Sequence, residues 1–241
     1  MPFSYREYEN MIELLCTNGY KITGYNNWQD YEKCVIFRHD IDFSIEKAVE
    51  FAKIEKRFNV NSTYFTLVSS NFYNVFSEKS CLLLNEIISS GHEIGLHFDE
   101  KRYPESYGNP DKIKEKVLFE KDVLERAIGQ EIKTLSMHRP SKEILASNLH
   151  IPGMINSYGN TFFKEFKYLS DSKCSWREPV LDIIKENKYN RLHILTHSFW
   201  YNKKEEKVNK MLEDFVNSAS NERYEDLNDN FSDLKEILPL R

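Results

Sequence analysis

Two carboxylates lie where an apolar run ends in the stretch CVIFRHDIDFSIEKA, residues 34–48. Charged side chains at the end of a buried strand are costly unless they are paired, hydrated or bound to a metal. Asp40 and Asp42 are two positions apart, so an extended backbone directs both to the same side. One can then serve as a metal ligand and the other as a general base. The alternative for Asp42 is that it, or Ser44, only caps the helix that follows.

Four further predicted strands end in residues that could take part in the same chemistry. They are His97 with Asp99 and Glu100, His138 with Arg139, Asp171 with Trp176, and His197 with Trp200 and Tyr201. Active sites of β/α folds gather at the carboxyl ends of the strands, so these side chains should meet. Aspartate and histidine with a third nitrogen or oxygen ligand suit zinc or a similar divalent ion. Such an ion lowers the pKa of a bound water to about 7 and makes it a nucleophile.

The elements that position these residues follow from hydrophobic periodicity. Helices are expected over 4–18, 44–58, 78–91, 111–128 and 177–188, and strands over 34–39, 62–68, 92–97, 132–137, 153–158, 166–170 and 191–197. About seven strands that alternate with helices predict a mainly parallel α/β fold, either closed as a barrel or open. We expect a single domain over 1–241, with an N-terminal helix at 4–18, a catalytic barrel at about 30–201 and a polar helical tail at 202–241.

Composition excludes several classes of function. Of the 241 residues, 40% are hydrophobic and 29% charged, which is typical of a globular protein with a sizeable core. A net charge of −5 gives no general attraction to nucleic acid or anionic membranes. No membrane span or signal peptide is evident, so a cytoplasmic location is expected. The motifs of serine hydrolases, P-loop NTPases and Rossmann dehydrogenases are missing, and the four cysteines form no CxxC pair.

Five short motifs together resemble those of the polysaccharide deacetylase family (carbohydrate esterase family four). They are RHDIDFS, GHEIGLHFD, HRPS, SDSKCSW and LTHSFW, in the order and rough spacing of that family over about residues 34–201. The first motif is most similar to a divergent branch with RHDxD. The resemblance implies a distorted (β/α) barrel, often of seven strands. It also implies metal-dependent hydrolysis of an N-acetyl, sometimes O-acetyl, group on a sugar.

The resemblance also implies a metal site. Asp42 resembles the metal-binding acid, and His97 the first histidine of the family's His-x-x-x-His pair. The second histidine would fall at position 101, where this chain has Lys101. The third ligand is therefore open among Asp99, Glu100 and His138, of which we favour His138, and zinc is the expected metal.

The remaining roles carry over by position. Asp40 resembles the general base and His197 the general acid. The arginine that the family places beside the base is displaced to Arg139, because His138 occupies its position. Asp171 and Trp176 match the fourth motif. The aromatic residues that could stack on the sugar ring are Trp176, Trp200 and Tyr201.

The leading hypothesis is a metal-dependent deacetylase that acts on the carbon–nitrogen bond of an acetylated sugar. A cytoplasmic location would favour a nucleotide-linked or lipid-linked glycan precursor as substrate. Two alternatives remain open: a degenerate sugar-binding protein, which Lys101 supports, and a metallohydrolase acting on another amide or ester. A binding protein would not need both a base at Asp40 and an acid at His197, which favours the enzyme.

Overall fold

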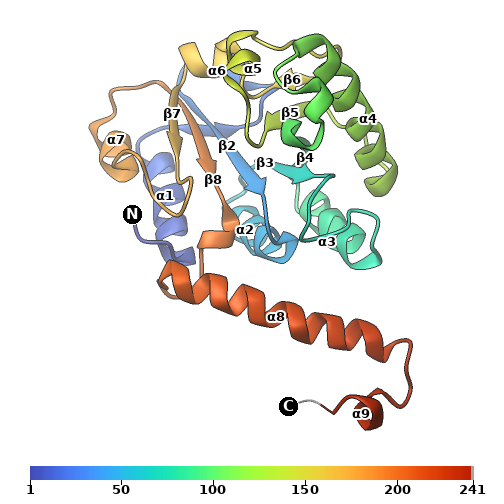
Figure 1. Ribbon diagram of the computed structural model, residues 1–241. Helices are drawn as coiled ribbons and strands as arrows, with labels where there is room; N and C mark the ends of the chain where they lie inside the picture. Colours follow the sequence, from blue (N-terminus) through green and yellow to red (C-terminus); the bar gives the residue numbers. More distant parts are fainter. Residues whose placement is uncertain (240–241) are drawn as a thin grey trace.

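A curled sheet of parallel strands forms the centre of the computed structural model, which describes residues 1–239 (Figure 1). The strand order is β6-β5-β4-β3-β2-β8-β7, and β1 pairs with β2 off this path. The strands are β1 (Lys21–Thr23), β2 (Cys34–Ile41), β3 (Thr63–Leu67), β4 (Glu93–Phe98), β5 (Thr134–Met137), β6 (Ile155–Asn156), β7 (Lys167–Ser170) and β8 (Arg191–Thr196). The predicted barrel of about seven strands is confirmed, with the short strand β1 as an addition. Among the described residues β6 and β7 do not pair, so the barrel is open there.

Helices lie around the outside of the sheet (Figure 1). The α-helices are α1 (Tyr5–Thr17), α2 (Ile45–Arg57), α3 (Glu78–Ser89), α4 (Pro110–Ile128), α5 (Lys142–Ala146), α6 (Asn160–Lys164), α7 (Val180–Glu186), α8 (Val208–Asn228) and α9 (Leu234–Ile237). Short 3₁₀ turns occur at Trp28–Asp30, Glu100–Arg102, Pro104–Ser106 and Ser198–Trp200. In the described part of the chain, no helix is both long and apolar enough to cross a membrane.

The start of α2 decides what Asp42 can do. Ser44 is the N-cap of this helix, and its hydroxyl accepts the backbone N–H of Lys47 at 3.3 Å. Capping therefore uses Ser44, as serine caps commonly do. The carboxylate of Asp42 is left free to face the end of the barrel.

The inner face of the sheet is tightly filled below the site. A small apolar cluster includes Tyr25, Ile36 and Phe65, separate from the larger core between sheet and helices. Gly95 faces it: a Cβ there would lie 2.5 Å from Thr134 Oγ1 and 2.6 Å from the Phe65 ring. Only glycine allows β3, β4 and β5 to pack this closely, two residues before His97.

The tail helix α8 crosses the end of the barrel near the end of β8 (Figure 1). It is held by Phe215, whose ring centroid lies 6.1 Å from Phe43, 5.5 Å from Phe72 and 5.1 Å from Phe199. The next residue along the helix, Val216, is 68% exposed. The predicted helical tail thus packs on loops that follow β2, β3 and β8.

A buried polar network, the Glu55 hub, lies between the sheet and helices α1 and α2. Glu55 Oε1 accepts from the Tyr8 hydroxyl at 2.6 Å and faces His39 Nε2 at 2.9 Å. Its Oε2 accepts from the Ser62 hydroxyl at 2.5 Å and the Tyr64 hydroxyl at 2.6 Å. All five residues are buried. Because both carboxylate oxygens have partners, the charge is tolerated in the core.

The hub predicts an acid-sensitive contribution to stability. Burial raises the pKa of Glu55, but the charge of His39 and its hydrogen bond outweigh burial and lower it from 4.5 to about 2. The ionised carboxylate therefore stabilises the folded state above about pH 4.5, and this is lost as the pH falls through about 2. We expect Glu55→Gln to lower the free energy of unfolding by about 3 kcal/mol at pH 7, and by less than half of that at pH 3. Denaturant unfolding of wild type and Glu55→Gln at both pH values measures this difference. An equal loss of unfolding free energy at pH 7 and pH 3 would contradict the predicted role of the ionised Glu55.

Candidate metal centre and catalytic site

Three predicted ligands converge at the carboxyl ends of neighbouring strands. Asp42 follows β2, His97 lies in β4, and His138 follows β5. Asp42 Oδ1 is 3.3 Å from His97 Nε2 and 3.2 Å from His138 Nδ1. The two imidazole nitrogens are 3.1 Å apart, and the three ligand atoms lie within 4.8 Å of one another. A single cation could therefore contact all three.

The donor set fits a divalent ion. Asp42 Oδ1 is buried and makes no well-formed hydrogen bond, although two imidazole nitrogens point toward it. An unsatisfied buried carboxylate oxygen is costly unless a cation neutralises it. Burial raises the pKa of Asp42, but the neighbouring His138 and His97 and the charge of His197 lower it well below its ordinary value. The group is thus ionised, as a ligand must be.

The turn after β4 shows which of the three residues considered as the third ligand can reach the site. Asp99 accepts the backbone N–H of Lys101 at 3.2 Å and pairs with Arg139. Glu100 accepts the backbone N–H of Ser141. Lys101 is exposed on this turn. Asp99 is therefore engaged elsewhere, and Glu100 is engaged through one oxygen only, since its Oε2 has no hydrogen-bond partner among the described residues. His138 is the residue that lies together with Asp42 and His97.

Asp40 is held beside this cluster by Arg38, which was not among the predicted site residues. Arg38 Nε donates to Asp40 Oδ1 at 2.9 Å and Nη2 to Oδ2 at 2.8 Å, and neither side chain is more than 4% exposed. Asp40 Oδ2 is also 3.5 Å from His97 Nε2. Burial raises the pKa of Asp40, but the Arg38 charge and hydrogen bonds lower it below its ordinary value. Asp40 is therefore an ionised carboxylate next to the place where a metal would bind.

Arg139 does not lie beside Asp40. Its guanidinium pairs with Asp99, and its side chain is 52% exposed. Arg139 therefore does not take the position next to the base that was expected for it. Arg38 lies there instead. Arg38 and Asp40 are two residues apart on one strand and share a face, a spacing that was visible in the sequence.

Removal of Arg38 should lower the free energy of unfolding much more than removal of Arg139. Arg38→Leu leaves a buried carboxylate without its partner, and we expect it to cost about 3–5 kcal/mol of unfolding free energy. Arg139→Leu breaks a half-exposed pair and should cost less than about 1 kcal/mol. Denaturant unfolding of the two variants beside wild type is the measurement. Similar losses in both would contradict the assignment of Arg38 as the partner of Asp40.

A histidine–aspartate pair lies on the other side of Asp42. His197 Nδ1 is 2.7 Å from Asp171 Oδ1, and the His197 backbone N–H also donates to this carboxylate at 3.1 Å. His197 Nε2 faces the site, 3.8 Å from Asp42 Oδ2. Burial lowers the pKa of His197, but the charge and hydrogen bond of Asp171 outweigh it and raise the pKa to about 9. Asp171 therefore favours the protonated form of His197, whose Nε2 can then donate.

The three aromatic residues chosen as sugar platforms differ in their surroundings. Tyr201 has no exposed surface and packs 5.8 Å from Tyr8 and 4.8 Å from Phe51 between ring centroids. Its ring faces are covered, so it has none to offer a sugar. Trp200 is 8% exposed, whereas Trp176 is partly exposed and packs on the core. Trp176 is therefore the more accessible of the two indoles.

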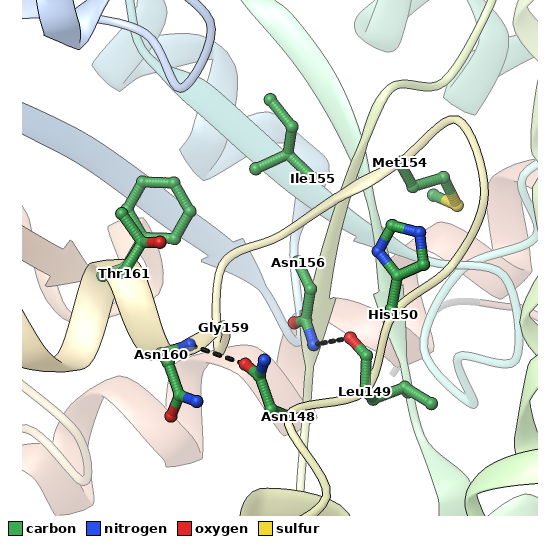
Figure 2. A pocket seen from close by; sticks show the side chains of 10 residues that line it. Asn148, Leu149, His150, Met154, Ile155, Asn156, Gly159, Asn160 and Thr161 are labelled. Atoms are coloured by element: carbon green, nitrogen blue, oxygen red, sulfur yellow. Dashed lines mark hydrogen bonds between the residues drawn. The ribbon is translucent and has the colours of Figure 1, made fainter.

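A hollow of about 220 Å³ lies away from these residues (Figure 2). It is lined by the connection from α5 to β6 and by the start of α6. Figure 2 shows its amides bracing the loop: Asn148 Oδ1 accepts the Asn160 N–H at 2.8 Å, and Asn156 Nδ2 donates to the Leu149 carbonyl at 2.9 Å. None of the candidate ligands, proposed reactive groups or aromatic platform residues is among the described residues that line this hollow. We assign it no part in the site.

A larger groove of about 1330 Å³ lies along α8. The loops that follow β2, β3 and β8, with the first turns of α2 and α3, form one wall, and α8 forms the other. Phe43, adjacent to Asp42 in the chain, and Phe199, two residues after His197, both line it. Its charged lining is mixed, with both lysines and acidic residues. Among the described residues that line it there is none of the three candidate ligands.

Comparison with known proteins gives a fold. No protein-family profile matches the chain, and no curated protein does. A CE4 esterase from Streptococcus mutans is 16% identical, with 82% of this chain and 80% of that chain covered and a TM-score of 0.50. A family 4 carbohydrate esterase from Bacillus anthracis is 15% identical, with 86% and 85% covered and a TM-score of 0.44.

A CE4 family pseudoenzyme from Bacillus anthracis is also similar. It is 16% identical, with 77% of this chain covered and a TM-score of 0.45, and the match spans only 61% of that protein's length. This chain also matches a mutant of a CE4 family pseudoenzyme with restored enzymatic activity, and the match covers 64% of the length of that protein. Identities this low establish only the fold. The chain has the fold of the CE4 carbohydrate esterases, as the sequence motifs predicted.

Proposed function

We propose that this protein is a metal-dependent hydrolase that removes the acetyl group from an N-acetylated sugar. The observation that carries the proposal is the arrangement around Asp42. The three candidate ligands meet at one point, with an ionised Asp40 on one side and a protonated His197 on the other. A base and an acid on opposite sides of a polarised carbonyl are the groups that amide hydrolysis needs.

The reaction divides between these residues. A divalent ion held by Asp42, His97 and His138, for which we favour zinc, would polarise the acetyl carbonyl and lower the pKa of a water. Asp40 accepts the proton of the attacking water, and Arg38 keeps its carboxylate ionised and oriented. His197 donates its Nε2 proton to the leaving nitrogen, while Asp171 holds the imidazole from behind. The products are acetate and an amino sugar.

Substrate contacts follow from accessibility. Trp176, and the edge of Trp200, are the aromatic groups we assign to the sugar, and Tyr201 supports them from the core. The groove along α8 would take the rest of a glycan or a carrier group. A nucleotide-linked or lipid-linked carrier stays a prediction from the sequence.

Acetate release tests this function. The purified protein, supplied with zinc, cobalt or manganese, is incubated with N-acetylated oligosaccharide, acetylated xylan or a nucleotide-linked N-acetyl sugar, beside Asp42→Ala. Release from an N-acetylated substrate that is lost in the variant supports the proposal. Release from xylan alone would favour an esterase. No release from any substrate, with sugar binding seen by calorimetry, would favour the sugar-binding alternative.

A further inference from the structure

The Glu55 hub extends across the sheet to the strand that carries the acid. His39 Nδ1 is 2.6 Å from Thr196 Oγ1 on β8, while its Nε2 faces Glu55. His39, Glu55 and Thr196 are fully buried, so water does not compete for these contacts. A continuous buried connection therefore runs from α2 through β2 to β8.

This connection lies at the end of the pairing between β2 and β8. The register runs from Cys34 opposite Arg191 to His39 opposite Thr196, and that is the last pair. The next residue on each strand is one of the two proposed reactive groups, Asp40 and His197. Because side chains alternate along a strand, His39 and Thr196 face the helices while the residues after them face the barrel interior.

We propose that the Glu55–His39–Thr196 relay is a positioning device that sets the separation of the base Asp40 and the acid His197; this inference rests on the proposed function. In the described structure the last residue pair of β2 and β8 is His39 with Thr196, and Asp40 and His197 lie beyond it. The side-chain bond between His39 and Thr196 is the last direct tie before the two reactive groups. Glu55, fixed by Tyr8, Ser62 and Tyr64, anchors the imidazole so that it cannot turn away.

Loss of the tie should affect turnover more than binding. The candidate metal ligands and the groove are not part of the relay, so metal and substrate affinity should survive. The relative positions of the base and the acid should change, and turnover should fall, because small misplacements of reacting groups lower the rate strongly.

A threonine series tests the relay. Thr196→Val removes the hydroxyl at nearly constant volume, and Thr196→Ser keeps it. Thr66→Val is the matched control, because Thr66 is equally buried and lies on the same face of β3 as Tyr64, and within residues 1–239 its Oγ1 has no hydrogen-bond partner. We expect Thr196→Val to lower kcat by about 10-fold or more, with KM and metal affinity within about two-fold of wild type. Thr196→Ser and Thr66→Val should keep kcat.

Equal kcat values in Thr196→Val and Thr66→Val would overturn the relay. If wild type releases no acetate from any substrate, the proposed function fails instead, and crystal structures of wild type and Thr196→Val decide the relay separately. It then predicts a change of more than about 0.5 Å in the distance between His197 Nε2 and the Asp40 carboxylate. An unchanged distance would overturn it.

Discussion

Asp40→Asn is expected to lower the rate of acetate release by more than about 100-fold while bound metal is retained. Asparagine has the shape of aspartate and still offers one oxygen to Arg38, so the geometry of the site should persist. The buried guanidinium loses its charged partner, so the free energy of unfolding should fall. It cannot accept the proton of the attacking water. Steady-state kinetics with metal analysis of the same sample measures both expectations.

Asp99→Asn is the matched control for this change. Asp99 also lies at the end of a strand, but its carboxylate pairs with Arg139 and is not among the candidate ligands. Its variant should keep the rate within about two-fold of wild type, because Asp99 pairs with the half-exposed Arg139 and not with a proposed reactive group. A mild loss in Asp40→Asn, comparable to that in Asp99→Asn, would remove Asp40 from the role of base.

Asp171→Asn is the second change with a large expected effect. The carboxylate of Asp171 keeps His197 protonated and holds its Nδ1 at 2.7 Å. An amide retains an acceptor for the His197 backbone N–H but removes the charge that raises the pKa of His197. By analogy with the aspartate of a catalytic triad, we expect a loss of about 100-fold or more in kcat.

The control for Asp171 is Asp182→Asn, an exposed aspartate in the first turn of α7. It should leave kcat unchanged. Kinetics on both variants, with thermal unfolding to confirm that each is folded, is the measurement. If Asp171→Asn turned over at a rate near that of wild type, His197 would not depend on its charge and would not be the acid.

Much of the fold could be predicted because buried parallel strands have a recognisable sequence pattern. The run at 34–37 is apolar on both faces, as a strand covered by helices on one side and a filled barrel on the other must be. β1 was missed, since three residues show no periodicity. β6 was expected over 153–158 but keeps only Ile155–Asn156, because Gly153 with φ of 75° precedes it in a turn.

The site was harder to predict where it depends on neighbours distant in sequence. The choice between Arg38 and Arg139 depends on the 3₁₀ turn after β4, which brings Asp99 to Arg139. Burial of Tyr201 depends on α1, because Tyr8 packs against it. Neither contact is local, and neither leaves a mark in spacing or composition. The strand-end positions of Asp42, His97 and His138 were predictable, since their grouping follows from parallel topology.

The metal content of the purified protein decides whether Asp42, His97 and His138 form a metal site. Protein purified without chelator or added metal, beside Asp42→Ala and His97→Ala, is analysed by plasma mass spectrometry for bound metal per chain. We predict close to one zinc or similar divalent ion per wild-type chain and almost none in either variant, because each change removes one of three ligands. A wild-type chain that holds no metal, even after incubation with zinc, cobalt, manganese or nickel, would contradict the assignment of this site.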